Sequence, residues 1–210
     1  MKNKFISISG TMGIGKSTLT TFIAREFNYL PIYENFKDNH FLSRFYLDMK
    51  RWAYHSQTFF LIEKAKQIHE INNFIKKKSI VQDTPIYQDV FSYAQAHFIM
   101  GNMEKAEWDQ YCEIYKLLED KLIIPDVIIH LTTPINIIYD RIKNRDRGFE
   151  RKNNKRQFVS YLKILNRLNN QWINKIKRKI KVIEIDITEF NYMNNKIEKE
   201  KMKAKIRQII

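Results

Sequence analysis

The residues with the most definite chemistry are Gly10-Thr11-Met12-Gly13-Ile14-Gly15-Lys16-Ser17, which fit the phosphate-binding loop pattern G-x-x-x-x-G-K-[ST] at every constrained position. In such a loop, glycines let backbone N–H groups surround an anion at the positive end of a helix. Lys16 would reach the β- and γ-phosphates of a nucleotide, and the Ser17 hydroxyl would bind Mg²⁺. Four fixed positions match by chance in roughly one chain of this length in a hundred. We therefore predict a phosphate site here.

Two acidic residues follow predicted strands. Glu34 comes after the strand-like run 30–33, and Asp83 ends the run 79–83. Ligands of open α/β folds bind beyond the carboxyl ends of strands, so both acids are placed where chemistry occurs. Glu34 could be a general base, although an ordinary surface-loop glutamate fits the spacing equally well. Asp83 could help to hold Mg²⁺, and it or Thr84 could also cap the helix that follows.

The segment 36–78 is helical in pattern and rich in aromatic residues. Most aromatic side chains at this density belong to a hydrophobic core. Tyr46, Arg51 and Gln57 are polar groups set among the rings, an arrangement that suits a flat heterocycle attached to a sugar. The Gln57 amide offers an acceptor and a donor side by side, which matches the edge of a nucleobase. Without other context, core packing is the simpler explanation.

An arginine-rich segment, 141–150, follows the predicted strand 126–131. The helix that leads into it is predicted to begin with Thr133 as its cap and Pro134 in its first turn. Arginine binds phosphate oxygens through two parallel N–H groups and keeps its charge. Because the segment comes after the fourth strand, we interpret it as a lid that closes over phosphates. The charge run alone would indicate only a solvated surface.

Strands and helices alternate along the chain, which predicts an α/β fold with a five-stranded parallel sheet covered by helices on both faces. The predicted strands are 4–9, 30–33, 79–83, 126–131 and 181–186. Besides those already mentioned, the predicted helices are 17–24, 104–122, 154–179 and a marginal amphipathic helix at 194–210. We interpret residues 1–190 as one domain and residues 191–210 as a basic C-terminal helix or tail.

The chain carries a formal net charge of +14 at pH 7. Such a charge can indicate a nucleic-acid partner. The lysines are scattered, however, and the densest run, 196–207, alternates with glutamates, so a solvated lysine-rich surface is favoured. The single Cys112 excludes an internal disulfide, and the five histidines lack the spacing of metal ligands. No signal-peptide pattern or membrane-length apolar run is present, so we expect a cytoplasmic protein.

Taken together, these residues resemble the deoxyribonucleoside kinase family, most closely its bacterial deoxyadenosine and deoxyguanosine kinases, over roughly residues 4–187. The phosphate loop alone is shared by many families, whereas the ordered set between loop and lid is far more specific. The residues that carry the resemblance are Gly10 to Thr18, Glu34, Phe45-Tyr46, Arg51-Trp52, Gln57, Asp83, Ile86-Tyr87-Gln88-Asp89, Arg141, Arg145, Arg147 and Glu150.

The resemblance implies a phosphate-loop kinase fold and the transfer of the ATP γ-phosphoryl group, with Mg²⁺, to the 5′-hydroxyl of a purine deoxynucleoside, deoxyadenosine first, in nucleotide salvage. It also implies a homodimer whose partners are these small molecules rather than nucleic acid or a membrane. The expected ATP-binding residues are Gly10, Thr11, Met12, Gly13, Ile14, Gly15, Lys16, Ser17, Thr18, Arg145 and Arg147. The residues expected to bind the deoxynucleoside are Glu34, Tyr46, Arg51, Trp52, Gln57, Asp83, Asp89 and Glu150. The expected catalytic residues are Glu34, Lys16, Arg141 and Arg145, and the expected metal-binding residues are Ser17 and Asp83.

Individual roles also follow from the resemblance. Glu34 is expected to take the proton of the 5′-hydroxyl, and Gln57 is expected to pair with the edge of the base. Tyr46 and Glu150 are similar to the pair that binds the 3′-hydroxyl. Trp52 resembles the aromatic wall of the nucleoside pocket. The lid arginines, Arg141, Arg145 and Arg147, match those that hold the donor phosphates.

One position departs from the family pattern, in which an acid is followed by arginine, because this chain has Asp83-Thr84. That arginine normally steadies the catalytic acid and the reacting oxygen, and losing one such cationic contact costs on the order of a few kcal/mol. Arg51 or Arg147 could take its place. Two other functions stay open: a nucleoside monophosphate kinase, and a nucleotide- or nucleic-acid-binding protein with weakened catalysis.

Overall fold

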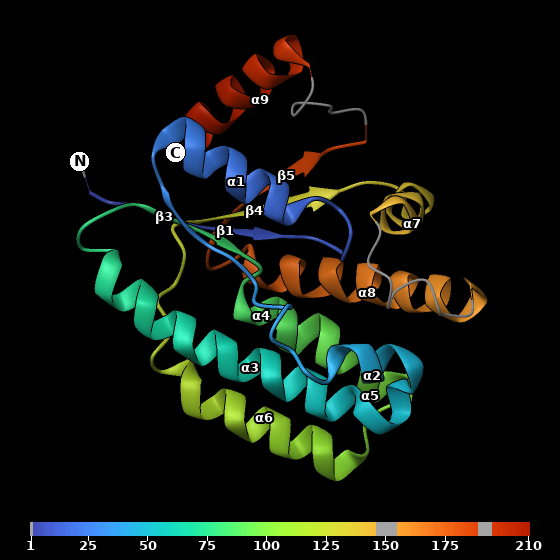
Figure 1. The fold of residues 1–210 in the computed structure, drawn as a ribbon. Coiled ribbons are helices and arrows are strands. Elements are labelled where there is room, and N and C mark those ends of the chain that lie inside the picture. The colour runs from blue at the N-terminus through green and yellow to red at the C-terminus, as the bar shows by residue number, and fades with distance from the viewer. Residues whose placement is uncertain (1, 146–154, 189–194) are drawn as a thin grey trace.

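Five parallel strands form the centre of the molecule in a computed structural model that describes residues 2–145, 155–188 and 195–210 (Figure 1). The strands are β1 (Phe5–Ser9), β2 (Leu30–Ile32), β3 (Ile80–Asp83), β4 (Val127–Thr132) and β5 (Lys181–Asp186), in the order β2-β3-β1-β4-β5. Each lies within one residue of its predicted bounds. Continuous apolar runs such as β1 and β4 are buried because helices cover both faces of the sheet. The predicted fold class is confirmed.

Helices lie on both sides of this sheet. They are α1 (Lys16–Phe27), α2 (Leu42–Leu47), α3 (Met49–Phe74), α4 (Ile86–Gln88), α5 (Gln95–Ile99), α6 (Lys105–Glu119), α7 (Ile135–Asn144), α8 (Lys155–Ile176) and α9 (Lys196–Ile209), with a π-helical segment η1 (Asp89–Ala94) between α4 and α5. Figure 1 shows α1 and α9 above the sheet and α3, α4, α6 and α8 below it. In the described parts of the chain, no helix combines the length and apolar character needed to cross a membrane.

The sheet brings the phosphate loop beside the end of β3. Strand β1 lies in the middle and pairs with β3 on one side and with β4 on the other. The register sets Ile8 of β1 beside Asp83 of β3, so the loop that leaves β1 starts next to Asp83. The chain runs from β1 to β2 and β3 on one side of the sheet, and then crosses β1 to β4 and β5 on the other side. The strand order therefore changes direction at β1, and ligands of α/β sheets bind at such a switch point.

The predicted helix 36–78 is wrong in its first part. After β2 the chain forms no helix until α2 begins at Leu42, and α2 and α3 are separate helices. Asp48, between them, has φ −145° and ψ 88°, and its side chain accepts a hydrogen bond from the Arg51 backbone N–H. An aspartate in this conformation caps a new helix, which explains why the helical pattern is interrupted there.

The predicted cap of α7 is also wrong. Pro134 occupies the N-cap position, and no side chain caps the helix. The Thr133 hydroxyl instead lies 3.0 Å from the Thr188 hydroxyl, beyond the end of β5. That hydrogen bond between the segments after two neighbouring strands takes the place of capping.

The C-terminal helix α9 packs against the rest of the fold. Its Met202, Ile206 and Ile209 are buried in the main hydrophobic core. Two of its lysines pair with Glu26 of α1: Lys199 at 2.5 Å and Lys203 at 2.8 Å. These contacts lower the pKa of Glu26 to about 2. The predicted amphipathic helix at 194–210 therefore forms and docks on the helix that follows the phosphate loop.

Candidate active site

The phosphate loop, residues 10–15, connects β1 to α1, and its backbone requires glycine at two positions. Gly13 has φ +79°, and a Cβ there would lie 2.4 Å from Ile142 Cγ1 in α7. Gly10 has φ +142°, and a Cβ there would lie 2.8 Å from the carbonyl oxygen of Leu131. Only glycine avoids both the backbone strain and these collisions. Helix α1 begins directly after the loop, so its positive end faces the loop.

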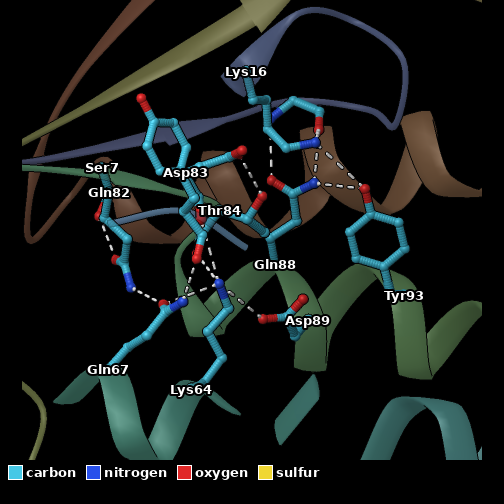
Figure 2. Close-up of polar contacts among 12 residues, drawn as sticks. Ser7, Lys16, Lys64, Gln67, Gln82, Asp83, Thr84, Gln88, Asp89 and Tyr93 are labelled. Carbon is cyan, nitrogen blue, oxygen red and sulfur yellow. Dashed lines mark hydrogen bonds and ion pairs between the residues drawn. The ribbon is translucent and has the colours of Figure 1, made fainter. Parts of the chain in front are cut away.

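Lys16 lies buried over its own loop. Its Nζ donates to the carbonyl oxygen of Gly10 at 3.0 Å and to the Tyr93 hydroxyl at 3.5 Å (Figure 2). Burial lowers the pKa of Lys16, while the carboxylates of Asp83 and Glu34 act in the opposite direction. Lys16 and the two predicted acids therefore lie close enough to act on one another's charge.

Two elements of the helical layer hold the phosphate loop through contacts that were not predicted from the sequence. Gln88 Oε1 accepts from the Gly10 N–H at 3.0 Å, and Gln88 Nε2 donates to the Gly10 carbonyl at 2.6 Å. The Thr11 hydroxyl donates to Asn166 Oδ1 and accepts from Asn169 Nδ2, both at 3.2 Å. Asn169 occupies a buried position of the amphipathic helix α8, one turn after Asn166, and a polar residue at such a position is a signal that could have revealed the second pair. Gln88 is among the residues that carry the family resemblance, but its contact with Gly10 was not predicted.

Ser17 and Asp83, the predicted metal-binding residues, lie together. The Ser17 hydroxyl donates to Asp83 Oδ2 at 2.5 Å, which joins the start of α1 to the end of β3. Hydroxyl and carboxylate oxygens are the ligands that Mg²⁺ prefers, so the donor set fits this ion. Within residues 2–145, 155–188 and 195–210, histidine, cysteine and acidic side chains form no group of three that could hold a metal. An ion here would therefore take further ligands from a nucleotide and water.

The turn after Asp83 has an uncommon backbone. Thr84 has φ +65°, which is rare for a β-branched residue. Its N–H donates to the Ile8 carbonyl at 3.1 Å, and its hydroxyl donates to Asp83 Oδ1, also at 3.1 Å. Pro85 is the N-cap of α4, and no side chain caps that helix, so the predicted capping role of Asp83 or Thr84 is wrong. The Thr84 hydroxyl orients the carboxylate instead.

Helix α3 and η1 pack together at the buried end of the site. Gln57 of α3 is 4% exposed and Asp89 of η1 is 1% exposed. Gln57 Oε1 and Asp89 Oδ2 have no hydrogen-bond partner among the described residues. Burial raises the pKa of Asp89 to about 7, and the Lys64 ammonium, 3.8 Å from Oδ2, acts against this shift. Because buried polar atoms are normally paired, two unpaired acceptors indicate a place for a ligand that donates hydrogen bonds.

Two buried tyrosines lie within the electrostatic influence of Glu34, which is half-buried after β2. Burial and then the charge of Glu34 raise the pKa of Tyr93 well above its usual range. Burial, Tyr46 and Glu34 raise the pKa of Tyr161 in the same way. These hydroxyls form polar surroundings that suit a sugar. Tyr93 and Tyr161 were not predicted, because nothing in their spacing separates them from core aromatic residues.

Arg51 and Trp52 lie at the outer end of α3. The Trp52 ring stacks on Phe41 with a centroid distance of 5.9 Å. The guanidinium groups of Arg44 and Arg51 lie 5.1 and 5.7 Å from the centre of the Trp52 ring, a cation–π arrangement. Arg51 is exposed, and its guanidinium rests on this indole rather than beside Asp83. The structure therefore does not place Arg51 where the missing arginine was expected.

The described lid arginines occupy two different places. Arg141 donates from Nη1 to the Ile14 carbonyl and from Nη2 to the Ile187 carbonyl, both at 3.1 Å, so it braces the phosphate loop against the segment after β5. Arg145 follows the last turn of α7, and its charge contributes to the lowered pKa of Lys16. Arg147 and Glu150 lie outside the described residues.

A family model for deoxynucleoside kinase matches residues 6–210. The chain is 29% identical to the deoxyadenosine/deoxycytidine kinase of Bacillus subtilis (strain 168), over 100% of this chain and 94% of that protein. It is 29% identical to the deoxyguanosine kinase of the same organism, over 98% of this chain and 97% of that protein. It is 30% identical to the deoxyadenosine kinase of Dictyostelium discoideum, over 90% of this chain and 75% of that protein.

The fold has close counterparts among solved structures. One is the deoxyadenosine kinase from M. mycoides with the products dCMP and a flexible dCDP bound. It matches with a TM-score of 0.81 at 22% identity and covers 97% of this chain and 99% of that chain. A second structure of that enzyme, with bound dATP, has a TM-score of 0.80.

Proposed function

Because this chain belongs to the deoxynucleoside kinase family and is an ATP-dependent deoxynucleoside kinase, we propose that its preferred acceptor is deoxyadenosine, phosphorylated on the 5′-hydroxyl in nucleotide salvage. The family assignment favours a nucleoside kinase over a monophosphate kinase or a binding protein without catalysis. The observation that carries the choice of base is a pair of buried acceptors, Gln57 Oε1 and Asp89 Oδ2, that have no hydrogen-bond partner among the described residues, although Asp89 Oδ2 lies 3.8 Å from the Lys64 ammonium.

The two acceptors call for a base that donates hydrogen bonds. The exocyclic amino group of adenine or cytosine has two N–H bonds and could serve both acceptors, whereas guanine presents a carbonyl oxygen at that position and carries its N–H donors at N1 and N2. A carbonyl oxygen facing Gln57 Oε1 or an ionised Asp89 would leave buried acceptors unpaired, which is unfavourable. Adenine is chosen over cytosine because relatives named deoxyadenosine/deoxycytidine kinase and deoxyadenosine kinase both include deoxyadenosine in their names.

In the proposed reaction, Glu34 accepts the proton of the 5′-hydroxyl as that oxygen bonds to the γ-phosphorus of ATP. The bond between the γ-phosphorus and the bridging oxygen to the β-phosphate breaks, which yields deoxyadenosine monophosphate and ADP. Lys16 and Arg145 bind the phosphates and stabilise the charge that moves onto the bridging oxygen. The shared electrostatic environment of Lys16, Glu34 and Arg145 supports these roles.

The remaining roles concern positioning. Tyr46 would bind the sugar together with Glu150, and Trp52 would form a wall of the nucleoside pocket. Arg141 would hold the donor end of the site through its bond to the Ile14 carbonyl. Ser17 and Asp83 would hold Mg²⁺, which neutralises charge on the β- and γ-phosphates when it is bound. Their contact at 2.5 Å supports this assignment.

Homodimer formation is part of the same proposal. Ile62 of α3 and Leu117 of α6 are 50% and 75% exposed, and large apolar side chains at the surface are suited to an interface. Sedimentation equilibrium tests the dimer directly, and a monomer at micromolar concentration would contradict it. The cytoplasmic location stays a prediction.

The test of the acceptor is phosphate transfer from ATP with Mg²⁺ to each of the four deoxynucleosides, to deoxyinosine and to deoxyadenosine monophosphate. Deoxyinosine has a carbonyl oxygen in place of the amino group of deoxyadenosine and an N1–H in place of the N1 acceptor, so it removes the donor on which the predicted hydrogen bonds depend. We expect its kcat/KM to be lower by about 10²-fold or more. Equal use of deoxyinosine and deoxyadenosine would refute the proposed base recognition without affecting the kinase assignment.

A further inference from the structure

Helix α3 places a lysine in the interior of the protein. Lys64 is 2% exposed and its side chain points toward the carboxyl end of β3 (Figure 2). Its Nζ donates to the carbonyl oxygens of Thr84 at 2.6 Å and Asp83 at 3.3 Å, and lies 3.8 Å from Asp89 Oδ2. Burying an ammonium group is unfavourable unless such partners surround it. The lysine and the turn after β3 therefore stabilise each other.

The Lys64 contact completes the support of a strained turn. The positive φ of Thr84 persists only if surrounding contacts hold it. The Thr84 N–H is held by Ile8, its hydroxyl by Asp83, and its carbonyl by the Lys64 ammonium. In this conformation Asp83 Oδ2 faces the Ser17 hydroxyl. Lys64 thus acts on the orientation of Asp83 through the backbone.

Gln67, one turn further along α3, extends the same support to β2. Its Oε1 accepts from Lys64 Nζ at 3.3 Å, and its Nε2 donates to the carbonyl oxygen of Tyr33 at 2.8 Å. Tyr33 directly precedes Glu34. Lys64 and Gln67 therefore cross-link the segments that carry Glu34 and Asp83 (Figure 2 shows the Lys64 and Gln67 side chains side by side).

We propose that Lys64 is a positioning residue for phosphoryl transfer, which holds the Asp83–Thr84 turn and Asp89 in place. This chain has Thr84 at the position where the family resemblance leads one to expect arginine. Lys64 thus supplies a positive charge beside Asp83 from helix α3, whereas the family arginine would supply it from position 84. Lys64 connects Asp89, which is proposed to bind the nucleobase, with Asp83, which is proposed to hold Mg²⁺ near the phosphates. This inference rests on the roles proposed above for Asp83 and Asp89.

The test compares Lys64→Met with Lys66→Met, a matched control two residues along α3 whose side chain is 70% exposed. Rates are expressed per ATP-binding site, so that loss of folded protein does not count as loss of kcat. We expect Lys64→Met to lower kcat by about 10- to 100-fold, because small misplacements of reacting groups have effects of this size. The Kd for ATP should stay within about threefold, since the phosphate loop is untouched. Lys64→Arg, which keeps the charge, should recover most of the rate, and Lys66→Met should behave as the parent.

A kcat for Lys64→Met within about twofold of the parent would overturn the proposal. If Lys64→Met does not fold, Gln67→Met carries the test, with an expected kcat about 3- to 10-fold below the parent at unchanged ATP affinity; a parental kcat would then overturn it. The measurements use whichever deoxynucleoside the parent phosphorylates fastest. Failure of the deoxyadenosine assignment is therefore seen in the parent, whereas failure of the Lys64 role is seen only in the variants.

Discussion

The contact between the phosphate loop and α7 allows a quantitative prediction for Gly13→Ala. The added methyl group would have to accept φ +79° and would start 2.4 Å from Ile142 Cγ1 and 2.8 Å from Ile142 Cδ1. A left-handed backbone costs a residue with a Cβ about 1–2 kcal/mol, and overpacking of a filled core adds about 1–3 kcal/mol. We therefore expect the free energy of unfolding to fall by about 2–5 kcal/mol, a large part of the stability of a typical domain.

Gly101→Ala is the matched control for the backbone effect. Gly101 has φ +72°, and a Cβ there would meet nothing within 4 Å. Only the backbone cost of about 1–2 kcal/mol applies. Urea unfolding followed by circular dichroism should therefore separate the two variants by the overpacking contribution alone. Equal destabilisation of the two variants would refute the predicted collision.

A double-mutant cycle with Ile142→Ala locates the collision. Ile142→Ala alone should cost about 2–5 kcal/mol by opening a cavity. In that background Gly13→Ala should cost only its backbone contribution, so the coupling energy should be about 1–3 kcal/mol. The affinity for ATP should also fall in Gly13→Ala, because displacement of α7 would disturb the hydrogen bond from Arg141 of α7 to the Ile14 carbonyl of the loop. Loss of a charged hydrogen bond, worth about 1.5–3 kcal/mol, would raise the Kd for ATP by about tenfold or more in Gly13→Ala. A coupling energy near zero would contradict this mechanism.

Three further predictions follow from the same geometry. Asp83→Asn keeps an oxygen that accepts from the Ser17 hydroxyl but removes the negative charge. We therefore expect a Mg²⁺ titration to show that more Mg²⁺ is needed for activity and that kcat is lower by about 10²-fold. An unchanged Mg²⁺ dependence would exclude Asp83 from the metal site. Thr84→Arg would bring a second cation close to the buried Lys64, so we expect a lower melting temperature and no gain in kcat, whereas a clear gain would mean that the family arginine is still needed. Burial lowers the pKa of His97 to about 3 and of His130 to about 4, both from 6.5, so the unfolded chain binds more protons below pH 6.5 and each histidine should remove about 2 kcal/mol of stability by about pH 5. The opposite effect of the raised pKa of Asp89 cancels when the parent is compared with His97→Gln, which should lose less stability on acidification; equal losses would refute it.

The strands and the phosphate loop could be predicted because their signals are local. Strands buried on both faces appear as continuous apolar runs, and β4 shows this along nearly its whole length. A loop of this pattern binds phosphate with its own backbone, so its requirements for glycine fall within one short segment. The strand order and the interruption at Asp48 are different, since no short segment encodes the pairing of strands and an aspartate cap competes with a strong helical pattern around it.

Lys64 illustrates a signal that was present but easily overlooked. The buried positions of α3 include Gln57, Leu61, Lys64, Gln67 and Ile71, which follow the helical period. A lysine at such a position should be exceptional, because charged side chains are rarely buried without partners. The partners themselves, two backbone carbonyls and Asp89, could not be foreseen because they depend on the left-handed turn at Thr84.

The two halves of the site depend on the fold in different ways, and this has a consequence for specificity. The proposed phosphate end is built from one loop, which is held through its backbone by Gln88 and through the Thr11 hydroxyl by α8. The proposed acceptor end is assembled from side chains on α3 and η1, where Gln57 Oε1 and Asp89 Oδ2 have no hydrogen-bond partner in the described part of the chain and are proposed to accept from a base. Lys64 contacts Asp89 of η1 and the carbonyl oxygen of Asp83, whose side chain accepts from Ser17 at the start of α1. Substitutions on the face of α3 that carries Gln57 and Lys64 should therefore change the choice of base and the rate together, whereas substitutions in the loop should change ATP binding for every acceptor alike.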